Sequence, residues 1–171
     1  MFETGAILVY LGEKSGQFYP SDPRGRYETL CWLMFQMGSV RPMFGQNHHF
    51  RRYAPQLGQE LTYALERYGK ETNRIYGVMD KRLSEYEWLA DDDYTIADTA
   101  TFAWVRLHER HKTDLNTFPS VQAVGADAMA AQPAVERGVS VLEDHMERVN
   151  ADLDPEVALE NFFGDTQYTH R

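Results

Sequence analysis

Apolar side chains return every three or four residues along most of this sequence, and no run alternates apolar and polar residues for long enough to predict a strand. Because this interval places apolar residues on one side of an α-helix, each such segment needs another helix to cover it. The pattern therefore predicts an all-α fold. The predicted helices cover residues 2–11, 22–37, 59–89, 96–108, 120–131 and 133–149.

Glycine and proline interrupt the helical pattern in two places. Gly12 and Gly16, followed by the turn-forming segment 19–23, end the first helix and predict a boundary near residues 16–22. Farther along, residues 38–46 contain two glycines and Pro42. Because these residues weaken or break helices, we expect an irregular segment there.

The charge of the chain excludes several classes of partner. Its formal net charge is -9, and no segment gathers enough Lys and Arg to neutralise a row of phosphates, so we expect no nucleic acid. The same sign is repelled by anionic membranes, and the longest apolar stretch, residues 6–11, is far shorter than the roughly 20 residues that cross a bilayer. No secretory signal precedes that stretch. We therefore expect a cytoplasmic protein with no membrane partner.

Cys31 is the only cysteine in the chain, which excludes an internal disulfide and a multi-cysteine metal site. Its neighbours are Leu30, Trp32 and Leu33. Such an apolar setting predicts that the thiol packs inside the protein, with a redox role as the alternative.

Four histidines raise the question of a metal site. His48 and His49 are adjacent, and they lack the i, i+4 spacing and the third ligand that a zinc site needs, so we expect no metal. His108 and His111 lie in a charged stretch and are expected on the surface.

Thr95 and Asp98 stand at the start of the apolar segment 96–108 and have the spacing of a capping box. Asp replaces the commoner Glu or Gln, and its carboxylate still suits a helix N-terminus. We expect this pair to serve folding, with no part in catalysis.

Four segments taken together resemble the nu-class glutathione transferases, which include bacterial disulfide-bond reductases. The similarity extends over roughly residues 2–150, and the segments that carry it are residues 2–8, 42–50, 64–68 and 94–98. The resemblance implies a glutathione transferase C-terminal helical bundle preceded by the last helix of a thioredoxin-like domain. It implies a remnant of the glutathione-binding domain at 1–18, the helical domain at 22–150 and a tail at 151–171.

The resemblance assigns Glu3 and Thr4 to glutathione binding, because this family starts that last helix with an acidic residue followed by Ser or Thr. A helix N-terminus and a hydroxyl suit the carboxylate of the γ-glutamyl end, and Glu3 suits its ammonium group. The alternative is that Thr4 only caps its own helix and Glu3 only favours the helix dipole.

Arg67 occupies the position from which this family presents an arginine toward glutathione, across to the neighbouring subunit. A guanidinium binds a peptide carboxylate through two hydrogen bonds. The alternative is a solvated arginine that pairs with Glu66 or Glu71 on a helix surface.

A further difference from the family lies in residues 121–127, where small residues and Gly125 stand in place of a usual aromatic pair. Because smaller side chains fill less volume, we expect less buried core at this place.

The function implied by the resemblance is glutathione-dependent thiol chemistry: transfer of glutathione to a small electrophile, or reduction of a small disulfide by a homodimer that uses glutathione as co-substrate. In this family the thiol-activating group comes from an earlier part of the thioredoxin-like domain. The expectation is therefore an N-terminally truncated chain with no catalytic residue assigned. The alternatives are a non-catalytic binding or interaction protein that lacks the thiol-activating domain, and a gene start placed too far downstream.

Overall fold

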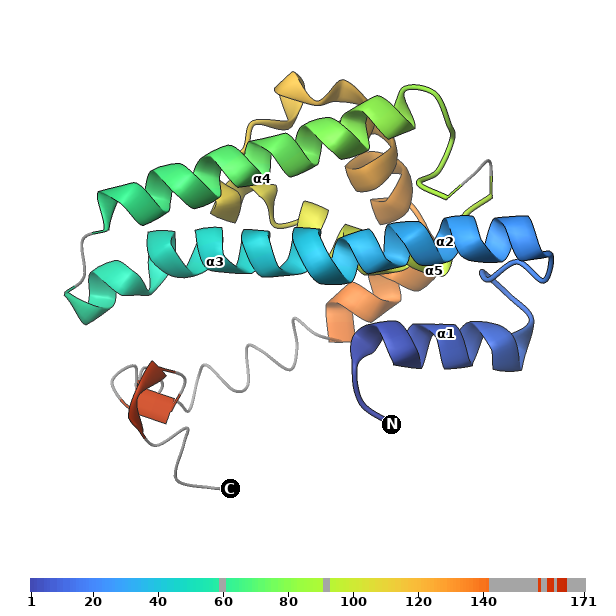
Figure 1. Cartoon of the computed structure of the whole chain (residues 1–171), viewed down its shortest axis with the longest axis horizontal. Helices are drawn as coiled ribbons and strands as arrows, with labels where there is room; N and C mark the ends of the chain where they lie inside the picture. Colours follow the sequence, from blue (N-terminus) through green and yellow to red (C-terminus); the bar gives the residue numbers. More distant parts are fainter. Residues whose placement is uncertain (59–60, 91–92, 142–156, 158–159, 162, 166–171) are drawn as a thin grey trace. The chain divides into compact units, whose positions relative to one another are not determined.

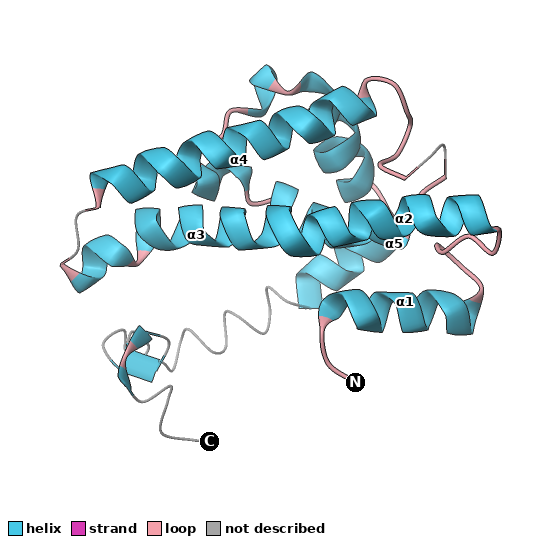
Figure 2. Ribbon diagram, viewed as in Figure 1, coloured by secondary structure: helices cyan, strands magenta, loops and turns pink. Residues whose placement is uncertain are grey.

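The computed structural model describes residues 1–58, 61–90, 93–141, 157, 160–161 and 163–165. Among these residues every regular element is a helix and none is a strand, so the predicted all-α fold is confirmed (Figure 2). The chain divides into two compact units, Met1–Met129 and Ala130–Arg171. No helix within the described ranges is both long and apolar enough to cross a bilayer.

One nearly continuous helical rod forms the centre of the first unit (Figure 1). It consists of α2 (Pro23–Phe35), the π-helical turn η1 (Gln36–Val40) and α3 (Arg41–Arg52). The prediction of an irregular segment at 38–46 was therefore wrong. The Arg41 N–H donates to the Gln36 carbonyl, five residues back, and this wider turn moves the backbone carbonyls away from the Pro42 ring, which would clash with them in a regular α-turn.

The buried side of α2 and η1 is partly polar, and this explains an error in the sequence interpretation. Thr29 and Gln36 are buried; the Thr29 hydroxyl donates to the Gly25 carbonyl at 2.8 Å, and the Gln36 amide donates to the Ala100 carbonyl at 3.2 Å. Cys31 lies on the exposed side, so its predicted packing role was wrong.

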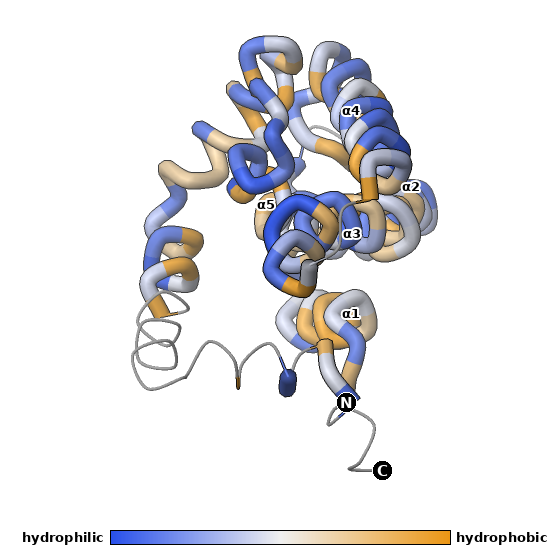
Figure 3. The backbone as a smooth tube through the Cα atoms, turned by 90° about the vertical axis from the view of Figure 1, so that its left-hand side faces the viewer, coloured by the Kyte–Doolittle hydropathy of each residue, from blue (hydrophilic) through white to orange (hydrophobic). Residues whose placement is uncertain are grey.

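Helix α1 (Thr4–Ser15) lies against α5 and the α2–η1 rod, on the side away from α4 (Figures 1 and 3). It approaches closely because two glycines face its neighbours: a Cβ on Gly5 would lie 3.4 Å from the Met37 side chain, and one on Gly12 only 2.7 Å from Tyr19 Cβ. Leu8 and Val9 pack on the smaller core cluster. The rest of its expected apolar face is more open, with Tyr10 45% exposed.

Helix α4 (Thr62–Leu83) runs alongside α3 and covers the main core (Figure 1). That core contains Val40, Phe44, Ile75, Tyr76, Met79, Leu83, Leu89, Val105, Leu115 and Val121. The helix ends at Leu83, six residues before the predicted end, because the Arg82 side chain holds the chain in a return loop through the carbonyls of Leu89 (2.8 Å) and Ala90 (2.6 Å).

Helix α5 (Ile96–Val105) starts with the predicted capping box, which is confirmed. One carboxylate oxygen of Asp98 accepts from the Thr95 N–H at 2.9 Å and from its hydroxyl at 3.0 Å, and the other accepts from the Leu89 N–H at 2.9 Å. Burial of Asp98 raises the pKa of its carboxyl, while these hydrogen bonds oppose the rise. Three short 3-10 helices complete this unit. One, η2 (Ala54–Leu57), follows α3, and the other two, η3 (His108–His111) and η4 (Leu115–Thr117), follow α5.

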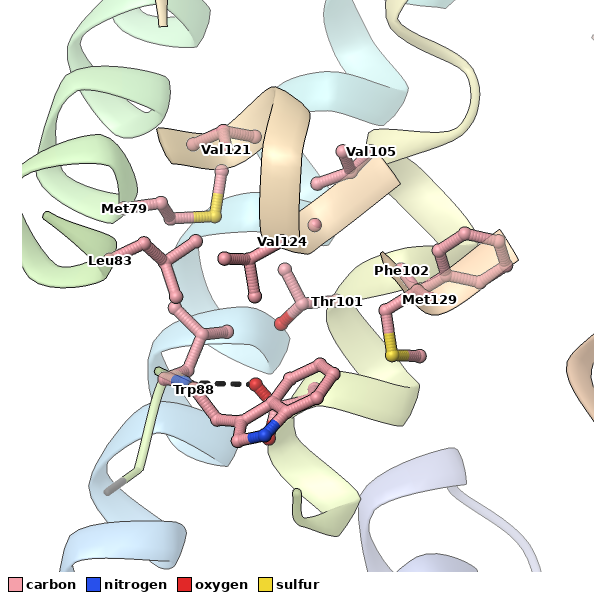
Figure 4. A pocket seen from close by; sticks show the side chains of 12 residues that line it. Met79, Leu83, Trp88, Thr101, Phe102, Val105, Val121, Val124 and Met129 are labelled. Atoms are coloured by element: carbon pink, nitrogen blue, oxygen red, sulfur yellow. Dashed lines mark hydrogen bonds between the residues drawn. The ribbon is translucent and has the colours of Figure 1, made fainter. Parts of the chain in front are cut away.

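The segment of small residues forms a π-helical stretch, η5 (Val121–Ala128), packed between α4 and α5. A cavity of about 20 Å³ lies here, and Val121, Val124 and Met79 are among the residues that line it (Figure 4). This volume holds about one water molecule or methyl group. The core at this place is thus incompletely filled.

The second unit is described only in part. Its residues 133–141 are helical, which agrees with the first half of the helix predicted at 133–149. The second half of that helix and most of the predicted tail at 151–171 lie outside the described residues. The predicted division at residues 18, 22 and 150 stays a prediction.

Substitution of Gly125 by Ala is expected to raise the free energy of unfolding by about 1 kcal/mol, because Ala favours a helix over Gly. The new methyl would lie 3.4 Å from Val121 Cγ1 and 3.6 Å from Val105 Cγ1, which is ordinary van der Waals contact. Urea unfolding measures the change.

Gly16→Ala is the matched control, because Gly16 ends α1 with a φ of 67° that disfavours any Cβ. It is expected to lower the free energy of unfolding by about 1 kcal/mol. If both substitutions destabilise equally, the cavity at Gly125 does not accept a methyl group.

Candidate functional site

The N-terminus of α1 presents exposed polar groups that have no internal partner in the described part of the chain. Glu3 is the N-cap residue and makes no side-chain capping hydrogen bond, and Thr4 is the first helical residue. Both side chains are exposed. The structure therefore does not show the alternative, in which the Thr4 hydroxyl caps its own helix. The first-turn N–H groups, a hydroxyl and a carboxylate remain available to a ligand.

Glu3 also has an unusual backbone, with a φ of 69°. An L-residue other than Gly is disfavoured in this region by roughly 1–2 kcal/mol. Such local strain is concentrated at positions that bind or react. The conformation therefore agrees with a ligand-binding role for the α1 N-terminus.

Arg67 lies on the exposed surface of α4 and forms no ion pair among the described residues. The two acids proposed as its alternative partners bind other cations: Glu66 contacts Lys70 at 3.6 Å and Glu71 contacts Arg74 at 2.7 Å. The Arg67 charge still helps to lower the pKa of Glu71, after the stronger effect of Arg74. Its guanidinium is thus available for another carboxylate.

A single chain does not bring these predicted residues together. Helices α1 and α4 lie on opposite sides of the α2–α3 rod in both views (Figures 1 and 3). An arginine on α4 therefore has to meet the α1 N-terminus of a second subunit if both hold one ligand.

The motif segment 42–50 lies on α3 and contributes a buried polar network. The Asn47 amide donates to the Thr72 hydroxyl and to the His111 carbonyl, each at 3.1 Å, and its oxygen accepts from Arg51 Nε at 2.7 Å. Asn47 is fully buried. These bonds tie α3 to α4 and to η3, and they fix the direction of Arg51.

His111 was predicted on the surface, and this prediction was wrong. Its side chain is 1% exposed; the ring lies 4.7 Å from the Phe44 ring, and Nδ1 lies 3.4 Å from the Tyr76 hydroxyl. Burial lowers its pKa to about 4. Charged neighbours on both sides of His111 gave no sequence signal for this burial.

His108 and His48 behave as polar packing residues. His108 Nδ1 lies 3.1 Å from the Thr113 carbonyl, and the His48 ring lies 5.5 Å from the Tyr53 ring. Burial, followed by the nearby charges of Arg110 and Arg52, lowers the pKa of His48. Within the described ranges no group of three or more His, Cys, Asp or Glu side chains is placed to hold a metal ion.

Comparison with known protein families and curated proteins gives consistent relatives. Residues 50–133 match the family described as glutathione S-transferase, C-terminal domain. The disulfide-bond oxidoreductase YfcG of Escherichia coli is 48% identical over 71% of this chain and 55% of its own length. The glutathione S-transferase-like protein gedE of Aspergillus terreus is 30% identical over 83% of this chain and 69% of its own length.

Solved structures give the same relationship. A Burkholderia graminis glutathione transferase with two bound glutathione molecules per subunit is 45% identical, with a TM-score of 0.74 over 81% of this chain and 59% of that one. The Phanerochaete chrysosporium glutathione transferase URE2P5 is 31% identical, with a TM-score of 0.79 over 88% of this chain and 69% of that one. The chain spans about half the length of the first curated relatives that it matches.

The buried His111 is expected to make stability depend on pH. Its folded-state pKa of about 4 lies below the usual 6.5, so the unfolded chain binds the proton first as pH falls. The contribution of His111 to the free energy of unfolding is then fully present above pH 6.5 and falls progressively toward pH 4, by about 3 kcal/mol in total. Chemical unfolding at a series of pH values measures this slope.

His111→Gln is the comparison, because it removes the titrating group and keeps a polar side chain of similar size. The variant is expected to lose less stability than the parent between pH 6.5 and 4, whatever its absolute stability. An NMR titration in which His111 protonates near its usual pKa would contradict the assignment.

Proposed function

Because this chain belongs to the glutathione transferase family, we propose that it binds glutathione at the N-terminus of α1 and serves glutathione-dependent thiol chemistry. The chemistry is transfer of glutathione to a small electrophile or reduction of a small disulfide. The observation that carries the proposal is the exposed, uncapped α1 N-terminus with Glu3 in a strained backbone conformation. A cytoplasmic location is part of the proposal.

The γ-glutamyl end of glutathione has charges that match this helix end. Its carboxylate accepts from the first-turn N–H groups and the Thr4 hydroxyl, and its ammonium binds the Glu3 carboxylate. Both charges of the ligand are then paired. These groups bind the γ-glutamyl end of the tripeptide, and none of them activates its thiol.

Arg67 of a second subunit completes the proposed site by binding a carboxylate of the same tripeptide. The available guanidinium of Arg67 and the position of α4 opposite α1 support this arrangement. The site therefore requires a homodimer. Exposed apolar side chains on α2 supply a surface for it, with Tyr27 70% and Met34 54% exposed beside Cys31.

A second candidate function is a binding protein that holds glutathione without turnover. It is favoured by the chemistry of the assigned groups, since Glu3, Thr4 and Arg67 contact charged ends of the tripeptide and none of them activates its thiol. Turnover with glutathione and 2-hydroxyethyl disulfide separates the two. Activity above buffer supports the enzyme, and binding without activity supports the binding protein.

Glu3→Gln is expected to weaken glutathione binding by roughly tenfold or more, because the amide cannot neutralise the ligand's ammonium group. Isothermal titration measures the affinity. Glu87→Gln is the matched control, since it removes the same charge from an exposed residue elsewhere, and it is expected to change the affinity by less than about twofold. Equal affinities for the parent and Glu3→Gln would reject the site at α1.

Met34→Glu is expected to shift the chain from dimer toward monomer, because it buries a charge in the proposed interface. Sedimentation velocity over a concentration series measures the change. Val141→Glu, at a residue 69% exposed on another helix, is the control and should leave the distribution unchanged. A parent chain that stays monomeric at all concentrations would contradict the proposed dimer.

A further inference from the structure

A cluster of positive side chains surrounds a hollow beside the C-terminal end of α3. This end of α3 lies away from the α1 N-terminus (Figure 1). The hollow has a volume of about 490 Å³. We name it the basic cleft; its lining residues are His48, Arg51, Arg52, Gln56, Glu109, Arg110 and Lys112. Four of them are cations at neutral pH and one is an acid, in a chain whose formal net charge is -9.

The cations of the basic cleft have no acidic partner in the part of the chain that the structure describes. The ion pairs there join other residues. Elsewhere on the same surface, acids neutralise their neighbours, as Glu71 does for Arg74 at 2.7 Å. Glu109 is the one acid against four cations in the lining and forms no ion pair with them among the described residues, so an anion in the cleft would reduce the repulsion that remains.

Arg51 is held in place by the fold, and Arg52 lies near an aromatic ring. Arg51 Nε donates to the buried Asn47 at 2.7 Å, and a Cβ at Gly69 would lie 3.2 Å from Arg51 Nη2, so the guanidinium lies directly against α4. Arg52 lies over the Tyr53 ring at 5.9 Å. Prior ordering of the Arg51 side chain lowers the entropy that a ligand must remove.

Unsatisfied imidazole nitrogens lie at the same place. Among the described residues, Nε2 of His48 and Nε2 of His111 are buried without a hydrogen-bond partner. His48 lines the basic cleft, and His111, 1% exposed, lines a neighbouring hollow of about 310 Å³ that shares Arg51 and Lys112. Buried polar atoms without partners are uncommon in folded proteins and call for a ligand, a water or an ion.

From this geometry we propose that the basic cleft binds a small multiply charged oxyanion, of the phosphate ester or polycarboxylate kind. Guanidinium groups bind such oxyanions through paired hydrogen bonds, and the volume lies within the range of small-molecule sites. A long polyanion is disfavoured, because beyond the cleft it would meet a strongly acidic protein. The inference does not rest on the proposed glutathione site.

Isothermal titration of the full chain with sodium pyrophosphate at low ionic strength tests the proposal. The double variant Arg52→Ala, Arg110→Ala is expected to bind at least about tenfold more weakly. The control Arg24→Ala, Lys81→Ala removes the same charge from exposed positions outside the cleft and is expected to change the affinity by less than about twofold. No binding by the parent, or equal losses in both variants, would overturn the proposal.

A second measurement uses the unsubstituted chain. Groups that face His48 are Arg110, Arg52 and His49, and a bound anion opposes the effect of the two arginines. Pyrophosphate is therefore expected to raise the pKa of His48 in an NMR titration, and an unchanged pKa at saturation would place the anion elsewhere and reject the cleft.

Isothermal titration with pyrophosphate, repeated in the presence of glutathione, distinguishes two sources of the oxyanion. An unchanged affinity for pyrophosphate identifies a phosphate-type ligand that binds separately from the tripeptide. Competitive displacement that is lost in the Arg52→Ala, Arg110→Ala variant identifies the carboxylates of glutathione as the ligand. Loss of glutathione binding in Glu3→Gln with intact pyrophosphate binding would leave this inference standing alone.

Discussion

The buried carboxylate of Asp98 fixes the N-terminus of α5, a helix on which several elements of the first unit pack. It accepts hydrogen bonds from Thr95 at the start of α5 and from the Leu89 N–H in the preceding loop. Helix α5 in turn contacts α1, α2 and η5. Because three elements depend on its position, a displaced α5 N-terminus would disturb the whole packing, including the seat of α1.

Polar side chains inside the helix interfaces fix the register of this bundle. The Gln36 amide donates to the Ala100 carbonyl and so joins η1 to α5, and Asn47 joins α3 to α4 and η3. Apolar packing alone would tolerate a sliding of one helix along another, whereas these bonds are satisfied in one arrangement only. The Asn47 network also determines where Arg51 lies, so the architecture of the core and the electrostatics of the basic cleft have a common origin.

The two proposed ligand sites differ in the chemical groups that they provide. The α1 N-terminus offers main-chain N–H groups and the side chains of Glu3 and Thr4, which suit a zwitterionic group. The basic cleft offers several cations and suits an oxyanion. They lie on different parts of the same unit, so one polypeptide presents two surfaces of different charge chemistry. The homodimer proposed for the glutathione site would place Arg67 of one subunit near the α1 N-terminus of the other.

The sequence by itself determined the helical class, the capping box and the family, because these depend on local spacing and on short motifs. Residues 95–98 and 42–50 carry that information in consecutive positions. It could also place Glu3 and Thr4 at a helix start and Arg67 on a helix surface. The proposed site brings these residues together through a second subunit, which no local pattern describes.

Only the tertiary structure decided which side of each helix is buried where polar residues face inward. Thr29 in α2 and Gln36 in η1 are buried while Cys31 is exposed, and His111 is buried between charged neighbours. The π-turn at 36–40 likewise kept Pro42 inside a continuous rod. The physical reason is that the hydrogen bonds made by these buried side chains come from residues far away in the sequence, which no local pattern predicts. The partners of Gln36 and His111 lie 35 or more residues away, and those of Asn47 include Thr72, 25 residues away, and His111, 64 residues away.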